Sequence, residues 1–532
     1  MAETLKKNEI TEEHQVSESS KPASAGSQAL KVKGEGQASG SSTSVQERNF
    51  GKSKTPNLTE TVYRQLYTRG YQEVMKVAMD EYTWLSELPV LHSLREEATG
   101  FGSGIAMSTA TATIPMPASD MVSMMMNVTE WEKSFSHIVY GSAVFGTGNA
   151  LQFLQNEDAA IQNLVGVFTK VQLPTTFEPM WDFDFLRYLK EITPGLYAIV
   201  DVSINFFDFT RESNARLSGL IIRENGHDKC EIIWVDTAIV SRPEERVTIY
   251  SSIINFGLPI SAGHWTSTLL WKQKRQSSAF SKLKISVHES AGPNLLEIAH
   301  EMKLFYKECV AQVPDNNMFE VYTTDEDEVR LMGIKSCTPK GNLDLVTCMC
   351  ITSIEIKDKA PLSVFNFLVK KNLQLLFSSL AGPGMPGQVL EFATDDGSNT
   401  ITLHRKKIGR EYIYYLQEAS RGEYCSFVIS RPLTEDEVNT FIINGAESVR
   451  DLSKEKLRSA AVSGFAIMPN GLGPECGSLV TWVMQLNCDP ITDFINSVNA
   501  VVNGIYETAE GVKVERSLFA CIPFLRSEGN DG

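Results

Sequence analysis

A cationic side chain interrupts an apolar strand face near the middle of this 532-residue chain. Alternate side chains of an extended strand point to the same side, so Arg187 would lie beside Phe183, Phe185 and Leu189. A buried guanidinium without a partner costs on the order of several kcal/mol, so it must meet a carboxylate, a group of waters or a ligand oxygen. A polar group in apolar surroundings is also what orients a ligand in a cavity.

The opposite assignment of this strand stays open, because a shift of one residue moves every side chain to the other face. In that case Leu186 and Tyr188 point inward and Arg187 faces solvent. Asp201 and Asp182 are the candidate acidic partners of an inward Arg187.

No recognisable catalytic or metal-binding pattern accompanies this arginine. The segment GPGMPG (382–387) has the spacing of a dinucleotide-binding loop, but it follows a helix-like run rather than a strand. His300 begins HEMKL as in a zinc-protease helix, but Leu304 occupies the position of the second histidine. The acidic run 325–328 lacks the glycine and the alternating ligands of a calcium loop. We therefore expect no catalytic residue, no metal site and no cofactor.

Composition places the chain among ordinary globular proteins, with 42% hydrophobic and 21% charged residues, and its length suggests two to four domains. The formal net charge of −16 argues against general nucleic-acid binding. The nine cysteines are scattered and form no C-x-x-C pair, which indicates reduced intracellular thiols. The polar beginning of the chain predicts no signal peptide, and the uncharged stretches are too interrupted to be membrane spans.

Residues 1–60 are rich in Ser, Gly, Lys and Glu and are predicted to be a disordered tail. An apolar pattern at helical spacing then predicts a helix over 61–88, too short and too broken by Gly70 for a leucine zipper. Two further helical fragments are predicted at 130–141 and 148–155.

Four strands and a helix follow. The strands are predicted at 183–190, 196–204, 216–224 and 229–236, joined by Pro-Gly and Asn-Gly turns, and the helix at 261–280. Sequential neighbours of this kind favour an antiparallel sheet covered by a helix, an α+β arrangement.

The second half repeats this order loosely. Strands are predicted within 343–358, 411–420, 423–432, 463–470 and 477–487, with helices starting at 361 and covering 491–505.

Several of these segments resemble, in the same order, the START lipid-binding domain of plant class IV homeodomain-leucine zipper proteins. FLRYLKEITPGLYAIVDVSI (185–204) and RLSGLIIRENGHDKCEIIWVD (216–236) are similar to its hairpins, and 250–276 to its closing helix. Asn127 and Trp131 match an Asn-x-x-x-Trp pattern upstream, and SGFAIMPNG and GSLVTWVMQL resemble the START-adjacent region.

The resemblance implies a domain division. It places a START domain at 61–285 and a START-adjacent α+β domain, possibly a second helix-grip-like unit, at 286–525, with a short tail at 526–532. No homeodomain-like recognition helix and no heptad repeat occur in the sequence, so no sequence-specific DNA binding is expected. Lys170 stands where an acidic residue is expected in relatives, which puts ligand specificity in doubt.

The family fold also implies a curved antiparallel sheet that grips a long helix, with an apolar cavity between them. The cavity-lining residues expected on this basis are Phe183, Phe185, Arg187, Ala198, Val200, Val202, Leu220, Ile222, Ile232, Trp234, Trp265 and Leu269.

The leading hypothesis is a non-enzymatic protein, in the nucleus or cytoplasm of a plant, that binds a lipid or sterol and takes part in transcription regulation. The second hypothesis is an interaction module that modulates related homeodomain-zipper proteins, with a purely structural pocket. A third, an enzyme on the same scaffold, requires an acid–base pair in the cavity, and the sequence does not supply one.

Overall fold

The computed structural model describes residues 60–81, 107–145, 164–175, 180–204, 215–239, 261–311, 318–319, 330–331, 334–335, 346–356, 359–377, 386–445, 462–470 and 476–488. All of them belong to one compact unit, Ser53–Gly532. The predicted tails and the predicted helices at 148–155 and 491–505 lie outside the described residues.

A seven-stranded antiparallel sheet forms the first half, in the order β1-β7-β6-β5-β4-β3-β2. Its strands are β1 (Met107–Ile114), β2 (Val139–Phe145), β3 (Leu164–Val171), β4 (Trp181–Thr193), β5 (Leu196–Ser203), β6 (Ala215–Glu224) and β7 (Cys230–Ile239). The four predicted strands are confirmed as β4 to β7. Gly195 and Gly226 have φ of 78° and 82°, the left-handed conformation that their turns require.

Three strands of this sheet were not predicted. β1 and β3 were missed, and β2 begins at Val139, inside the segment 130–141 that was predicted to be helical. The helix there, α5 (Val128–Ser134), ends with Phe135 as its C-cap, and the β-branched Ile138 and Val139 lie where β2 begins. The prediction was therefore right for the first half of the segment and wrong for the second.

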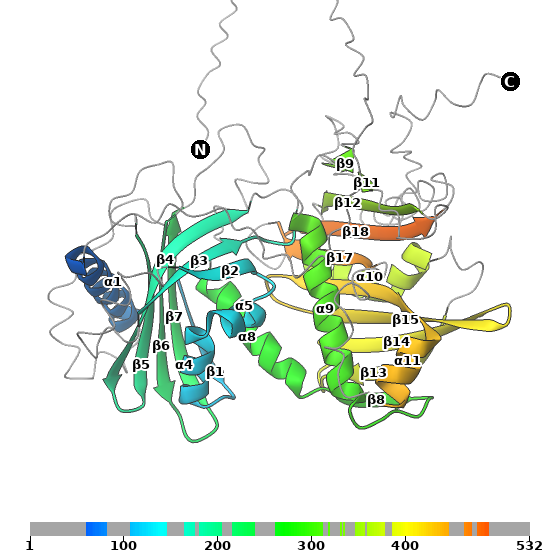
Figure 1. The fold of residues 1–532 in the computed structure, drawn as a ribbon, viewed down its shortest axis with the longest axis horizontal. Coiled ribbons are helices and arrows are strands. Elements are labelled where there is room, and N and C mark those ends of the chain that lie inside the picture. Colours follow the sequence, from blue (N-terminus) through cyan, green and yellow to red (C-terminus); the bar gives the residue numbers. More distant parts are fainter. Residues whose placement is uncertain are drawn as a thin grey trace, which may run out of the picture. The chain divides into compact units, whose positions relative to one another are not determined.

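Helices cover both faces of the first sheet (Figure 1). On one face lies α1 (Glu60–Glu81), which confirms the predicted first helix. On the other face lie α4 (Ala118–Met126), α5 and α8 (Ala262–Gln276), the predicted closing helix, whose buried side chains join one hydrophobic cluster with the sheet. The first half is therefore an α+β domain with a long helix on one face of an antiparallel sheet.

Two glycines let α1 approach the sheet closely. A Cβ atom added to Gly70 would lie 2.1 Å from Cγ2 of Val202, and one added to Gly219 would lie 2.0 Å from Cγ1 of Val74. Each glycine thus makes room for a valine of the other element. Gly70, which weakened the helical pattern in the sequence, has a packing role.

The second half contains a nine-stranded sheet in the order β10-β12-β18-β17-β16-β15-β14-β13-β8. Its strands are β8 (Ala279–Leu283), β10 (Arg330–Leu331), β12 (Val346–Ile356), β13 (Gly387–Ala393), β14 (Asn399–Ile408), β15 (Glu411–Ser420), β16 (Ser426–Leu433), β17 (Ser463–Pro469) and β18 (Ser478–Cys488). β9 (Met318–Phe319) and β11 (Ile334–Lys335) form a separate pair. The predicted strands are confirmed as β12, β15, β16, β17 and β18.

Helices also lie against this second sheet (Figure 1). α9 (Ala291–Ala311) contributes eight buried side chains to the core with the strands, and it was not predicted. α10 (Pro361–Phe377), which was predicted to start at 361, contacts β16, β17 and β18. Its Asn372 donates hydrogen bonds to Gln417 of β15 (3.0 Å) and Ser430 of β16 (2.5 Å). Leu416 and Ile429, which precede these two residues in the sequence, belong to the core that contains α9. α11 (Glu435–Val438) and a π-helix (Asn439–Ile443) follow β16.

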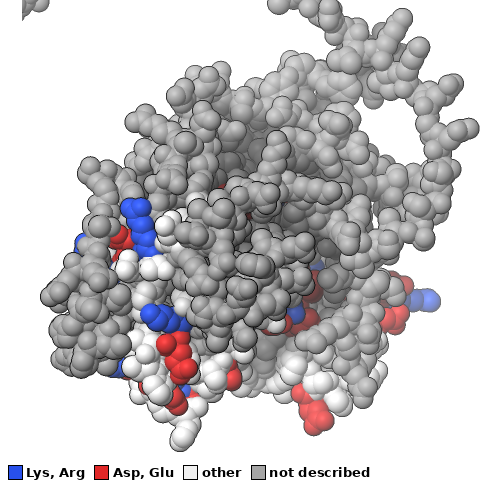
Figure 2. Space-filling model, turned by 60° about the vertical axis from the view of Figure 1, so that its left-hand side comes forward, with Lys and Arg blue, Asp and Glu red and all other residues white. Residues whose placement is uncertain are grey.

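The described surface carries charged side chains of both signs (Figure 2). On the described part of the face in Figure 2, basic and acidic side chains lie next to each other rather than in a continuous basic patch. Among the described residues, no helix has the length and apolar character needed to cross a bilayer.

Candidate ligand-binding site

Arg187 lies on the face of the first sheet that α8 covers, and its charge is fully paired. Its Nε and Nη2 donate to the two carboxylate oxygens of Asp201 at 2.7 and 2.8 Å, and Nη1 donates to the backbone oxygen of Met125 at 2.6 Å. The guanidinium also lies 4.5 Å from the ring centroid of Trp131. Arg187 is 0% exposed, so the solvent-facing alternative is wrong.

The second candidate partner is engaged elsewhere. Asp182 lies opposite Lys170 on β3, and their charged atoms are 3.7 Å apart near the surface. Arg187 instead lies opposite Val165, another residue of β3. In this chain, Lys170 is therefore not a neighbour of the buried arginine.

A second buried ion pair lies on the same face. Arg216 at the start of β6 donates to Asp236 on β7 from Nε (3.1 Å) and Nη2 (3.0 Å), and from Nη2 also to Ser218 (3.2 Å). Both charged residues are 1% exposed. Burial raises the pKa of Asp236 to about 6, an effect that the Arg216 guanidinium partly offsets.

Arg187 and both aspartates belong to one row of polar residues across five strands, and Arg216 precedes Ser218 of this row by two residues on β6. In register, Arg187 faces Asp201, Asp201 faces Ser218, Ser218 faces Asp236, and Asp236 faces Ser108 on β1. Ser108 in turn accepts a hydrogen bond from the backbone nitrogen of Ala262, the first residue of α8 (2.9 Å). The row therefore extends from β4 to the start of α8.

The next row along the strands is apolar. Leu189, Ile199, Leu220, Trp234 and Ala110 face one another in the same order of strands. This face thus carries a polar row next to an apolar row, as in pockets that hold an apolar ligand by one polar group.

Three tryptophans form a stack between the sheet and α8. Trp265 of α8 is stacked on Trp131 (5.9 Å between ring centroids) and on Trp234 (5.7 Å). The guanidinium of Arg216 lies 4.5 Å from the Trp265 ring. None of the three rings is more than 2% exposed, so they fill much of the space beside the polar row.

Most of the predicted cavity residues lie on this face. The core that includes α8 contains Phe183, Phe185, Leu220, Ile222, Ile232, Trp234, Trp265 and Leu269, and Arg187 contacts it through Trp131 and Phe185. Their contact with a ligand stays a prediction.

The placement of Ala198, Val200 and Val202 on this face is wrong. They lie on the opposite face and pack in the cluster that contains α1. The cause is a β-bulge: Thr193 pairs with Leu196, but beyond Ile192 the register shifts by one residue and Glu191 pairs with Tyr197. The shift turns Ile199 and Asp201, instead of Val200 and Val202, toward α8.

Sequence reasoning left Ser218, Asp236 and Arg216 out of the site. Strand alternation could have found all three, because each lies an even number of residues from Leu220 or Trp234, which were assigned to the correct face. The Met125 oxygen could not have been found, because a backbone acceptor has no signal in the sequence.

The other side of α8 meets the second sheet. Arg275 of α8 and Lys303 of α9 both approach Glu418 of β15, at 2.9 and 2.6 Å. The ammonium group of Lys303 also lies 3.7 Å from the Trp271 ring centroid, and the Trp271 indole donates to Asn399 of β14. Burial lowers the pKa of Lys303 to about 7 despite the Glu418 carboxylate.

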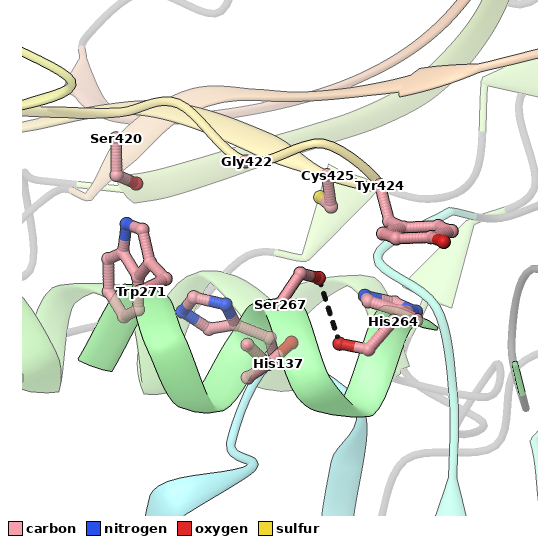
Figure 3. Close-up of a pocket in the computed structure, with 9 residues that line it drawn as sticks. His137, His264, Ser267, Trp271, Ser420, Gly422, Tyr424 and Cys425 are labelled. Carbon is pink, nitrogen blue, oxygen red and sulfur yellow. Dashed lines mark hydrogen bonds between the residues drawn. The ribbon is translucent and has the colours of Figure 1, made fainter. Parts of the chain in front are cut away.

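A small cavity of about 20 Å³ lies beside this cluster (Figure 3). It is lined from one side by α8 and His137 and from the other by the turn between β15 and β16, with Ser420, Tyr424 and Cys425. Ser267 of α8 donates to the backbone oxygen of His264 within it (3.1 Å). A volume of this size holds about one water molecule, so it is not a lipid site.

Comparison with known families gives two matches. Residues 65–254 match the START domain, and residues 290–516 match the PDF2-like C-terminal domain. α8 and β8 lie between the two matched segments.

Two relatives that match most of the chain are homeobox-leucine zipper proteins of Arabidopsis thaliana. GLABRA 2 is 24% identical over 441 residues, 76% of this chain and 57% of the relative. HDG3 is 24% identical over 506 residues, 90% of this chain and 65% of the relative. The chain therefore spans less than two thirds of the length of these relatives.

Solved structures give weaker likenesses. The lipid transfer and protein localization domain of human StarD13 is 14% identical, covers 31% of this chain and 74% of its own, and has a TM-score of 0.22. The di-domain ARO/CYC protein BexL is 9% identical, covers 78% of this chain and 96% of its own, and has a TM-score of 0.18. Scores this low carry no inference about ligand or activity.

The chain therefore consists of a START domain followed by a PDF2-like C-terminal domain, and its homologues are plant homeobox-leucine zipper proteins of class IV.

Proposed function

We propose that the chain binds a lipid or sterol without chemical conversion, on the face of the first sheet that α8 covers. The observation that carries this proposal is the START match together with a buried face on which a polar row lies next to an apolar row. A ligand that buries about 400 Å² of apolar surface there gains on the order of 10 kcal/mol before entropic costs.

The regulatory role proposed for this binding uses α8. One side of the helix contributes Trp265 and Leu269 to the START core, and the other contributes Trp271 and Arg275 to contacts with the second sheet. A ligand that repacks the Trp265 side favours one position of the helix, and the C-terminal domain responds to that position through Glu418. Related homeodomain-zipper proteins are the proposed partners and the nucleus the proposed location, by analogy with the relatives.

Lipid capture tests the first part of the proposal. Purified protein is incubated with vesicles of plant total lipid and separated from them by size exclusion, and the lipids that remain bound are extracted and identified by mass spectrometry. The proposal expects close to one lipid per chain, of one class. Protein that is folded but free of lipid after this treatment contradicts the proposal.

An interaction module with a structural pocket is the second candidate. The tryptophan stack favours it, because Trp131, Trp234 and Trp265 already fill part of the space where a ligand would lie. On this account, incubation with lipid leaves both hydrogen exchange in α9 and β15 and binding to homeodomain-zipper relatives unchanged.

A further inference from the structure

The two buried arginines of the first sheet differ in how completely they are paired. Each of the three nitrogens of Arg187 has an acceptor: Asp201 for Nε and Nη2, and the Met125 oxygen for Nη1. Arg216 uses Nε and Nη2 for Asp236 and Ser218. Its Nη1 is buried and has no hydrogen-bond acceptor among the described residues.

A buried donor without an acceptor is costly, so its presence needs a physical explanation. The tryptophan stack beside Arg216 holds two more such donors. The indole Nε1 of Trp131 and that of Trp265 are buried without an acceptor among the described residues, and Trp265 contacts the Arg216 guanidinium. The two aspartates of the row, in contrast, each accept from an arginine through both carboxylate oxygens. Arg216 Nη1 and the two indole nitrogens are therefore hydrogen-bond donors without acceptors among the described residues, and a ligand group that satisfies them must be an acceptor.

Charge decides between kinds of acceptor. Arg187 and Arg216 are balanced by Asp201 and Asp236, so the two buried ion pairs together are neutral when both aspartates are ionised. A carboxylate or phosphate brought next to them would be an unbalanced buried charge, which is strongly unfavourable. A carbonyl or hydroxyl oxygen adds no charge and still accepts a hydrogen bond from Nη1.

We propose that Arg216 binds the polar oxygen of the ligand, that this oxygen belongs to a carbonyl or hydroxyl group of a neutral lipid, and that Arg187 only supports the fold. This proposal rests on the lipid-binding function proposed above and names the class of its ligand. The apolar row of Leu189, Ile199 and Leu220 lies beside Arg216's ion pair and would take the hydrocarbon part.

Two lipid probes and two matched substitutions test the proposal. Dehydroergosterol is neutral with a hydroxyl group and cis-parinaric acid is an anion, and both are polyenes that quench tryptophan fluorescence by energy transfer. Trp131, Trp234 and Trp265 thus report the binding of either probe from one stack. Arg216→Lys and Arg187→Lys make the same chemical change at the two ion pairs, each keeping a cation opposite its aspartate. Only Arg216→Lys removes a donor that is free for a ligand, and urea unfolding of both variants checks that they are folded.

We expect the full chain to bind dehydroergosterol more tightly than cis-parinaric acid. Arg216→Lys should weaken dehydroergosterol binding about tenfold or more, the usual effect of losing a hydrogen bond from a charged group, and Arg187→Lys by less than about threefold. Unchanged binding in Arg216→Lys would overturn the proposal, because it would show that Nη1 of Arg216 makes no hydrogen bond to the ligand. Tighter binding of cis-parinaric acid would overturn the neutral class. If the unaltered chain binds neither probe nor any lipid from vesicles, the lipid-binding function itself fails.

Discussion

Arg187 and Asp201 lie directly opposite each other on β4 and β5, and two guanidinium nitrogens contact the two carboxylate oxygens at 2.7 and 2.8 Å. This relationship explains why an arginine shares a strand face with two phenylalanines. The charge is neutralised by the strand next to it, and the remaining nitrogen is held by the backbone of α4. These three hydrogen bonds account for the burial of the Arg187 charge in the START core.

Removing one partner of this pair should destabilise the fold strongly. Arg187→Met leaves the Asp201 carboxylate buried without its cation, and we expect the free energy of unfolding to fall by about 3–5 kcal/mol. The variant Arg187→Met/Asp201→Leu replaces the pair with apolar side chains and should recover part of this loss. Urea unfolding of the unaltered chain and the two variants measures both losses. No recovery in the double variant would mean that the unpaired Asp201 carboxylate is not the cause of the loss in Arg187→Met.

Gly219→Ala tests the close approach of α1. The added Cβ overlaps Val74, and overpacking of this kind costs about 1–3 kcal/mol. Val74→Ala removes the overlapping atoms, so the double variant should be more stable than the sum of the single effects by at least about 0.5 kcal/mol. Chemical denaturation of the four proteins gives this coupling. If the two substitutions show no coupling, Val74 of α1 does not pack against position 219 of the sheet as closely as described.

The stability of the chain should depend on pH through Lys303. Its pKa is lowered to about 7 by burial, between Glu418 and Arg275 and near the Cys425 thiol. Between pH 7 and the ordinary lysine value, the unfolded chain binds a proton that the folded chain does not, so stability rises with pH across this window. We expect a gain of up to about 2 kcal/mol from pH 7 to 9.

Lys303→Met should abolish this rise. Lys282→Met is the control, because Lys282 pairs with Glu391 while the side chain stays 59% exposed. Thermal or urea unfolding at several pH values makes the comparison. An equal slope in both variants would assign the rise to other groups.

Glu418→Gln should loosen α8 from the second sheet. The substitution leaves Arg275 of α8 and Lys303 of α9 buried without their carboxylate, which is unfavourable. Faster hydrogen exchange is expected in the peptide 262–276, whereas Glu391→Gln, at a surface pair, should leave it unchanged. Equal exchange in the two variants would show that the ion cluster does not hold the helix.

Local signals in the sequence were enough to predict many of the strands. Pro194-Gly195 and Asn225-Gly226 marked two hairpins, and alternation placed Leu220, Ile222, Ile232 and Trp234 on the correct face. β1 (MSTATATI) was missed because its Ser and Thr residues make it polar and half-exposed at the sheet edge.

Two other features depend on geometry that the sequence does not display. The bulge at Ile192 shifts the β4–β5 register by one residue. The prediction did not include this shift and therefore placed Ala198, Val200 and Val202 on the wrong face. The contact of Trp271 with Asn399 joins residues 128 positions apart, so no local pattern could predict that α8 is shared with the second sheet.

The ligand is proposed to lie on the α8 side of the first sheet. Leu220 and Ile221 test it as neighbours on β6 that are both buried, Leu220 toward α8 and Ile221 toward α1. Leu220→Trp and Ile221→Trp therefore overpack opposite faces by the same change.

The most direct measurement is native mass spectrometry of the two variants and the unaltered chain after exposure to plant lipids, with circular dichroism to confirm folding. We predict a lipid adduct on the unaltered chain and on Ile221→Trp, and its loss from Leu220→Trp. An adduct that survives in Leu220→Trp and disappears from Ile221→Trp would place the ligand on the α1 side and contradict the account.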